Sequence, residues 1–463
     1  MCRPSIICIT IFIFCQSINS QNIFRNACRS NLIKLDSLLT NESINIRDDR
    51  GRSLLHWAIG CKTPKVLDYL LEKNIKIDIE DNQGRVPLIV AINFNDQGSF
   101  DKLLKLYKRK ELISKYGSDL LGKSILKRNA YFINELVSSG VDLNKRNNRG
   151  SLPIEIADRI EANDIYNLLI SLGASEKKIR KPKFKGLYMG QSKPGKKPKL
   201  FAPHFISTEE QEFGSVFNAD GTEFYYAVDM GGRNEIRFSK MEENHWSKPK
   251  TILSHQNYSY NDPFLSNDEN CLYFISQMPL SGEGKVKDVD IWHVERTDKG
   301  WSKPINAKKN INTKRDEYYI SFTKDGTMYF ASNGHTREDT NRKDHDIYYS
   351  KFINNEFQKP VLLDAAINTN GYEADVFVAP DESYLIFCAI RDSGYGQGDL
   401  YISFKQANGE WSKATNMGSS INSNGYEYCP FVTKDGKYLF YTSNQDIYWV
   451  STKIIMDIKK QKM

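Results

Sequence analysis

Carboxylate side chains recur at a fixed place in the C-terminal half of the chain. A glutamate lies eight residues before four of five turn aspartates, and the remaining copy has an aspartate close to the equivalent position. These candidate ligand-binding residues are Glu212, Asp262, Glu317, Glu373 and Glu427. Such carboxylates bind a cation or a polar, sugar-like ligand, or form the carboxylate pair of a glycosidase. The alternative is a structural role, in which each one hydrogen-bonds a neighbouring repeat. We favour the structural role, because packing residues follow repeat symmetry whereas catalytic residues break it.

Other catalytic and metal-binding signatures are missing from the sequence. It has no H-E-x-x-H, G-x-S-x-G or P-loop motif, so we expect a non-catalytic protein without a cofactor. Five cysteines follow the first twenty residues and none forms a C-x-x-C pair, so no zinc or other metal site is indicated. Cys28 and Cys61 lie 33 residues apart. We expect both thiols to be free, because stacked helices lie about 8–10 Å apart and a disulfide needs Cα atoms within roughly 7 Å.

The glutamates belong to a unit that repeats every 48 to 57 residues from about residue 197 onward. Each unit has an apolar strand, a turn such as Asp325-Gly326, and an aromatic strand such as Met328-Tyr329-Phe330, a pattern that predicts a hairpin. A third strand begins with Asp-Ile-Tyr or a variant, and a fourth carries Trp-Ser-Lys-Pro or a variant. Four strands per unit are typical of β-propeller blades, whose innermost strands line a central channel.

The ends of this region predict how the ring closes. The last unit lacks a fourth strand, and residues 197–201 carry the matching segment upstream of the first unit. We therefore expect five blades over residues 197–463, with six as the alternative. These units resemble the WD40-like repeats of the TolB type, called PD40, of bacterial exported proteins. The resemblance implies a propeller that serves as a scaffold or as an accessory domain, and it implies no particular partner.

A second period of 33 residues precedes the propeller. Gly51, Gly84, Gly117 and Gly150 are spaced by this interval, and an apolar pair follows each glycine by nineteen residues. The blocks that begin at Gly51, Gly84 and Gly150 resemble the ankyrin motif G-x-T-P-L-H-x-A. The resemblance implies an α-solenoid of ankyrin repeats over residues 21–175, with residues 21–47 as a divergent capping repeat. The unit at Gly117 departs most from the motif and is supported by spacing alone.

A basic segment separates the two repeat systems. Ten Lys or Arg and no acidic residue lie between Lys177 and Lys199, together with prolines and glycines, so residues 176–196 are expected to form a linker. It is either a solvated connection or a weak tether to an anionic envelope surface. The net charge of +7 is concentrated there rather than on a folded face, which argues against nucleic-acid binding.

The N-terminus has the pattern of a secretory signal peptide. Arg3 precedes an apolar stretch over residues 6–15 and small or polar residues up to Ser20. The stretch is too short to span a bilayer, and no later segment approaches the required length. We expect export with cleavage near Ser20, to the periplasm or out of the cell. The expected function is a non-catalytic scaffold that binds a protein or other ligand through the ankyrin face and one propeller mouth. The alternative is a glycan-binding or glycoside-hydrolase-like propeller that uses the channel glutamates.

Overall fold

The computed structural model describes residues 21–39, 43–109, 111–178, 184–334 and 344–462. The chain divides into two compact units, Met1–Arg180 and Lys181–Met463. The first is helical and carries ankyrin repeats, and the second is a five-bladed β-propeller. The expected signal peptide, residues 1–20, lies outside the described residues.

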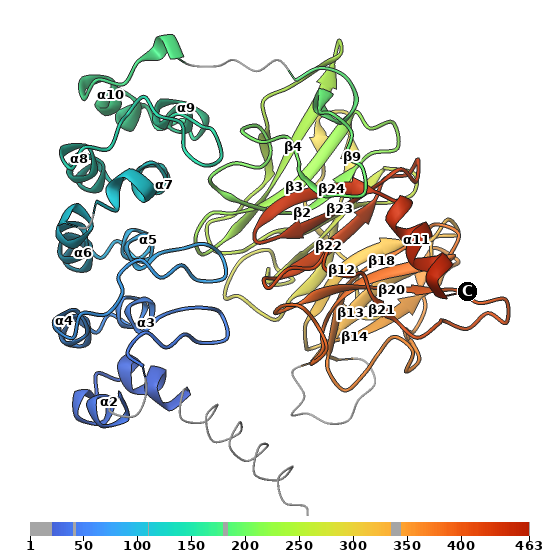
Figure 1. Cartoon of the computed structure of the whole chain (residues 1–463). Helices are drawn as coiled ribbons and strands as arrows, with labels where there is room; N and C mark the ends of the chain where they lie inside the picture. Colours follow the sequence, from blue (N-terminus) through green and yellow to red (C-terminus); the bar gives the residue numbers. More distant parts are fainter. Residues whose placement is uncertain (1–20, 40–42, 110, 179–183, 335–343, 463) are drawn as a thin grey trace, which may run out of the picture. The chain divides into compact units, whose positions relative to one another are not determined.

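The ankyrin unit is a stack of helix pairs (Figure 1). After a helical segment over residues 21–28, one row contains α3 (Leu54–Gly60), α5 (Pro87–Asn93), α7 (Ile113–Leu126) and α9 (Pro153–Arg159), and successive members of this row contact one another. The second row contains α2 (Leu32–Leu39), α4 (Pro64–Glu72), α6 (Gln97–Arg109), α8 (Ala130–Ser138) and α10 (Asn163–Ser171). Both helices of each pair turn apolar side chains toward one continuous core, which no single repeat would bury alone.

The repeat glycines do not all serve the same purpose. Gly51, Gly84 and Gly150 have φ between 72° and 76° and precede α3, α5 and α9, as a tight turn requires. Gly117 instead lies within α7, where an added Cβ would come 2.8 Å from Val141 Cγ2. The third repeat therefore needs its glycine for a close approach between segments, and its longer helix replaces the turn.

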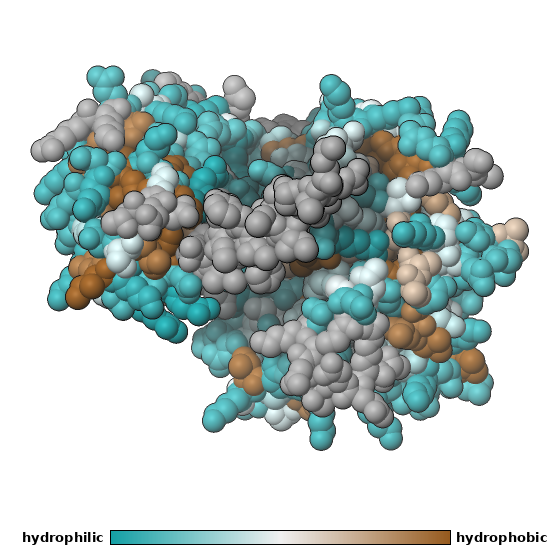
Figure 2. Space-filling model, turned by 60° about the horizontal axis from the view of Figure 1, so that its bottom comes forward, coloured by the Kyte–Doolittle hydropathy of each residue, from teal (hydrophilic) through white to brown (hydrophobic). Residues whose placement is uncertain are grey.

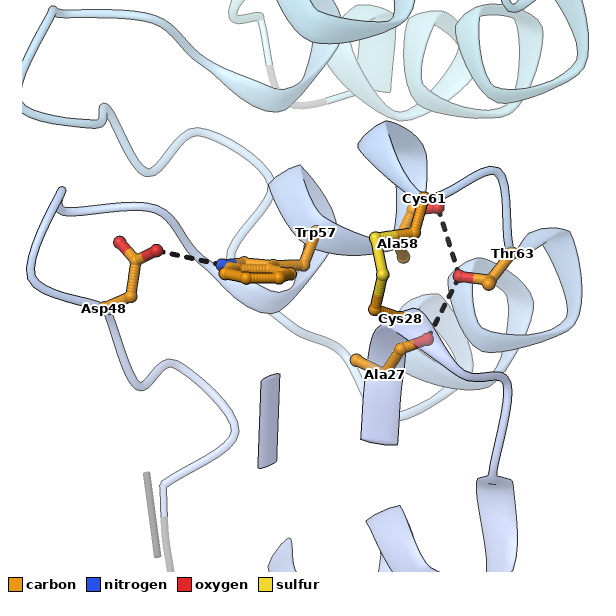
Figure 3. Close-up of a disulfide and its surroundings, with 7 residues drawn as sticks. All are labelled: Ala27, Cys28, Asp48, Trp57, Ala58, Cys61 and Thr63. Atoms are coloured by element: carbon orange, nitrogen blue, oxygen red, sulfur yellow. Dashed lines mark hydrogen bonds between the residues drawn. A yellow bond between two sulfur atoms is a disulfide. The ribbon is translucent and has the colours of Figure 1, made fainter. Parts of the chain in front are cut away.

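Cys28 and Cys61 form a disulfide, so the expectation of two free thiols is wrong (Figure 3). Their Cα atoms lie 5.2 Å apart. The distance of about 8–10 Å applies to helix axes. Cα atoms lie about 2.3 Å from the axis, so Cα atoms on facing sides of two helices are closer together than the axes are. Cys61 is the C-cap residue of α3, and the neighbouring Thr63 hydroxyl lies 3.2 Å from the Ala27 carbonyl and 3.1 Å from that of Ala58. The same junction is therefore joined both covalently and by hydrogen bonding.

Each propeller blade is an antiparallel sheet whose strands follow the predicted order. The innermost strands are β2 (Gln211–Phe217), β7 (Asn261–Leu265), β12 (Glu317–Phe322), β18 (Tyr372–Val378) and β22 (Glu427–Val432). The second strands are β3 (Glu223–Asp229), β8 (Cys271–Ser276), β13 (Met328–Ser332), β19 (Tyr384–Ile390) and β23 (Tyr438–Ser443). The third strands are β4 (Asn234–Glu242), β9 (Asp290–Thr297), β14 (Asp346–Ser350), β20 (Asp399–Phe404) and β24 (Asp446–Ser451).

Short outer strands complete the blades. They are β6 (Lys250–Leu253), β11 (Ile305–Asn306), β17 (Val361–Leu362), β21 (Thr415–Asn416) and β1 (Lys199–Leu200). Strand β1 pairs with β24, with Leu200 opposite Tyr448, so the start of the propeller closes its last blade. This closure removes the exposed sheet edges that an open ring would leave. Further short pairings involve β5 (His245–Trp246), β10 (Gly300–Trp301), β15 (Phe352–Ile353) and β16 (Glu356–Phe357), and α11 (Lys453–Lys462) follows the last blade.

Part of the segment expected to be a linker packs onto the propeller. Tyr188 and Met189 are buried in the propeller core, where the Tyr188 ring lies 4.9 Å from Tyr438 and 5.6 Å from Trp449. The Gly186 carbonyl accepts a hydrogen bond of 2.8 Å from the Trp246 indole. Lysines, prolines and glycines dominate the composition of this segment, but the few aromatic and apolar side chains among them are the ones that pack against the core.

Candidate functional site

The four repeat glutamates are fully buried and bonded within their own blades. Each carboxylate accepts from the backbone N–H and the side-chain hydroxyl of the Thr or Ser four residues earlier. Glu427 shows the arrangement: it accepts from the Ser423 N–H at 2.8 Å, the Ser423 hydroxyl at 2.6 Å and the Ser443 hydroxyl at 2.7 Å. The corresponding partners are Thr208 for Glu212, Thr313 for Glu317 and Thr369 for Glu373.

The backbone of the same glutamates connects neighbouring blades. The Glu427 N–H donates to the Gly398 carbonyl at 2.8 Å, and the Glu317 N–H donates to the Val289 carbonyl at 2.9 Å. Glu212 and Glu373 make the equivalent bonds to Gln445 and His345. Each glutamate thus fixes the loop before its innermost strand while its own N–H bonds to the preceding blade. A ligand role for these carboxylates stays a prediction, because a ligand would have to displace this bonding.

Two residues after each of the four glutamates, and after Tyr260 in the second blade, the innermost strand makes a β-bulge. The pairing register shifts there in all five blades, and the residue at that position has φ between 44° and 52°. These residues are Gly214, Asp262, Tyr319, Asp375 and Cys429. Because they come from five different blades, a meeting of their side chains can occur only near the axis.

Asp262, Asp375 and Cys429 do meet. All three are buried, and their carboxylate and thiol atoms lie within 4.8 Å of one another. The Cys429 thiol donates to Asp262 Oδ1 at 3.2 Å, and the Cys429 N–H bonds to the Asp375 carboxylate. An added Cβ on Gly214 would lie 2.8 Å from Asp262 Oδ1, so the glycine makes room for that carboxylate.

Burial governs the protonation of this axial group. It raises the pKa of Asp262 to about 6, and burial together with the Asp262 charge raises the pKa of Asp375 well above its ordinary value. Burial also raises the pKa of Glu317 to about 8 and that of Glu427. Carboxylate and thiol groups are donor types that metal sites use. The raised pKa values also favour protonated carboxyl groups, which can lie close together without charge repulsion.

A separate pocket of about 390 Å³ lies on the ankyrin unit. It is formed by residues 21–29, the turn 48–52 and α3. Its lining residues are Gln21, Phe24, Arg25, Cys28, Arg29, Asp48, Asp49, Arg50, Arg52 and Trp57. Trp57 is held by its indole N–H, which donates to Asp48 at 2.9 Å (Figure 3), while Arg52 lies over the ring and pairs with the same carboxylate. The pocket therefore has an aromatic wall beside the arginines Arg25, Arg29 and Arg50.

The face of the molecule in Figure 2 is mostly hydrophilic. On the face in Figure 2, hydrophobic side chains form several separate patches rather than one broad band. Among the described residues, no helix is long and apolar enough to cross a membrane.

Comparisons with known proteins support the ankyrin assignment. The family model for ankyrin repeats matches three copies over residues 23–115. An ankyrin repeat protein of Acanthamoeba polyphaga mimivirus is 24% identical over 139 residues, which is 29% of this chain. The chain spans 18% of the length of that relative. The likeness therefore concerns the repeats and not the activity of the whole viral protein.

Sequence reasoning placed Asp262 among the candidates and missed Asp375 and Cys429. The available signal was positional: both lie two residues after a repeat glutamate, as Asp262 lies two residues after Tyr260. Alternation along a regular strand would put positions 260 and 262 on one face. The bulge breaks that alternation, so the glutamate side chain turns into the blade while the residue two places later reaches the axis.

Proposed function

We propose that this protein is an exported, non-catalytic scaffold that binds a protein partner through the pocket of its ankyrin unit. The observation that carries the proposal is the grouping of Arg25, Arg29 and Arg50 around the Trp57 indole in a pocket of about 390 Å³. Aromatic and arginine side chains are the types that contribute most binding energy in protein interfaces. The ankyrin fold supports the same conclusion, because its stacked repeats present an extended concave binding surface.

The charge of the pocket defines the chemistry of the partner. Asp48 is engaged by Arg52 and by Trp57, whereas Arg25, Arg29 and Arg50 have no ion pair among the described residues. Arg25 lies on the helical segment 21–28 and Arg29 on the turn that directly follows it, and both line the pocket. A partner segment with carboxylates flanking an apolar or aromatic side chain would pair with the arginines and pack on Trp57.

The export part of the proposal rests on two supports. The N-terminal pattern is that of a signal peptide, and the Cys28–Cys61 disulfide is typical of an oxidising compartment outside the cytosol. The propeller is proposed to be of the TolB-like PD40 type, on the strength of its repeat motifs. The glycan-binding alternative gains no support from the four glutamates, because each is fully buried and bonded within its blade.

The pocket is tested by reversing its charge in the full chain. Arg25→Glu/Arg29→Glu is compared with Lys65→Glu/Lys105→Glu, which makes the same change of net charge at exposed positions of α4 and α6. Partners captured from an extracellular or envelope fraction are identified by mass spectrometry and then titrated individually by calorimetry. We expect the pocket variant to lose at least tenfold in affinity and the control to lose less than twofold. Equal affinities for both variants would overturn the assignment of the pocket.

A further inference from the structure

Three side chains of the types that bind metal ions meet on the second propeller blade. They are Cys271 on β8 and His293 and Glu295 on β9. Cys271 pairs directly with Glu295 in the antiparallel register, and Tyr273 pairs with His293. Side chains alternate along a strand, so all three ligating side chains lie on one face of the blade. Their donor atoms lie within 4.8 Å of one another.

Packing fixes the position of the His293 ring, but its buried Nδ1 atom has no hydrogen-bond partner among the described residues. The Tyr273 ring lies 5.2 Å from the imidazole, and Tyr273 is itself packed 5.0 Å from Phe322 of the next blade. His293 Nε2 lies 3.9 Å from the Glu295 carboxylate, which is beyond hydrogen-bonding distance. A buried nitrogen without a partner is unfavourable, and coordination of an ion would give the ring a partner.

We propose that Cys271, His293 and Glu295 bind a zinc-class divalent ion. Thiolate, imidazole and carboxylate are the three protein ligands that zinc takes, and a tetrahedral ion needs only one further donor. Glu295 is 58% exposed, so water can supply the fourth position and the carboxylate is free to move inward. Binding releases the Cys271 thiol proton to solvent and forms one metal–sulfur bond. The cysteine discriminates against magnesium and calcium, which prefer an all-oxygen environment.

The site joins the paired strands β8 and β9 through residues up to 24 positions apart in the sequence. The site has no C-x-x-C pattern in the sequence, because its ligands are distributed over two strands. The axial group of Asp262, Asp375 and Cys429 is less suited to an incoming ion, since it is buried and its thiol already bonds to a carboxylate.

Cobalt(II) is the probe, because a thiolate–cobalt bond gives a charge-transfer absorption band in the near ultraviolet. The full chain is stripped with a chelator, kept free of thiol reductants to preserve the Cys28–Cys61 disulfide, and titrated. We expect one cobalt per chain with a thiolate band that zinc abolishes and magnesium does not. The band should be lost in Cys271→Ser. In His293→Gln the affinity for cobalt should fall at least tenfold. It should be unchanged in His245→Gln, an exposed histidine of the first blade.

A second measurement on the unaltered protein keeps the test independent of variant folding. Among the free cysteines of the described residues, Cys271 is half-buried whereas Cys388 and Cys429 are buried, so native alkylation followed by peptide mass spectrometry should label Cys271 ahead of these two. We expect zinc to slow this labelling at least tenfold, magnesium to leave it unchanged, and a chelator to restore it. Labelling that zinc does not slow, or a thiolate–cobalt band that persists in Cys271→Ser, would overturn the proposal. Neither outcome depends on the identity of an ankyrin partner.

Discussion

Cys28 and Cys61 occupy equivalent positions of adjacent repeats and are joined by a disulfide, with Cα atoms 5.2 Å apart. The bond therefore fixes the capping repeat to the first full repeat at the end of the stack. Each repeat of a solenoid contacts only its neighbours, so the disulfide adds a covalent link to the packing between these two repeats.

Removal of this bond should destabilise the ankyrin unit. Cys28→Ser/Cys61→Ser releases a loop closed over a sequence separation of 33 residues, for which chain entropy predicts a loss of about 3–4 kcal/mol. Urea unfolding followed by far-UV circular dichroism measures the change. Cys271→Ser in metal-free buffer is the control and should stay within about 0.5 kcal/mol of the original protein. A double variant with an unchanged midpoint would show that packing alone holds the cap.

The buried Glu317 should make stability depend on pH in a defined direction. The pKa of Glu317 is raised by burial to about 8, so the folded protein holds a proton that the unfolded chain loses above its ordinary pKa near 4.5. Stability from this group is therefore fully present below about pH 4.5 and is lost as the pH rises toward 8. Glu317→Gln retains a carbonyl acceptor for Thr313 and cannot ionise. We expect the fall in unfolding free energy between pH 5 and pH 8 to be shallower in Glu317→Gln, and parallel curves would contradict this.

The axial carboxylates predict a gain of stability from a neutral substitution. Burial raises the pKa of Asp375 well above its ordinary value, and the nearby Asp262 raises it further. Asp375→Asn keeps an acceptor for the Cys429 N–H and removes one of two like charges. The Tm of the variant should exceed that of the original protein at pH 8, and the difference should shrink at pH 5. A variant that is less stable at both values would mean that a carboxylate is required at the axis, as a bound cation would require.

Periodicity made most of the fold predictable from the sequence. The 33-residue interval and the four-strand motif depend on local turn chemistry and strand alternation, which a single sequence displays directly. Closure by residues 197–201 followed from counting strands, and β1 pairs with β24 as that count requires. Gly117 was the exception, because spacing alone does not distinguish a turn glycine from one that permits a close helix contact.

The candidate sites were less predictable because they depend on spatial relations that no spacing encodes. Asp375 and Cys429 reach the axis only through a bulge, and the ligands Cys271, His293 and Glu295 meet only through strand pairing. The disulfide depends on which sides of two helices face each other. Each of these relations becomes visible once the register and the helix faces are known.

The segment that follows the ankyrin unit provides a last test, since residues 184–190 are expected to fold with the propeller. Tyr188 is buried against Tyr438 and Trp449, and its hydroxyl donates to Asp435 at 3.2 Å. Tyr188→Ala should destabilise the propeller by about 3–5 kcal/mol, as is usual for a buried aromatic residue.

Tyr188→Phe should cost no more than about 1.5 kcal/mol, because only one hydrogen bond is lost and Asp435 keeps its bonds to Thr433 and Lys437. Tyr395→Ala, at an exposed loop position, is the matched control. Calorimetric unfolding of the full chain reports the propeller transition. If Tyr188→Ala left that transition unchanged, residues 184–190 would act as the solvated linker that their composition suggests, because a side chain that contributes packing energy to the core cannot be removed without cost.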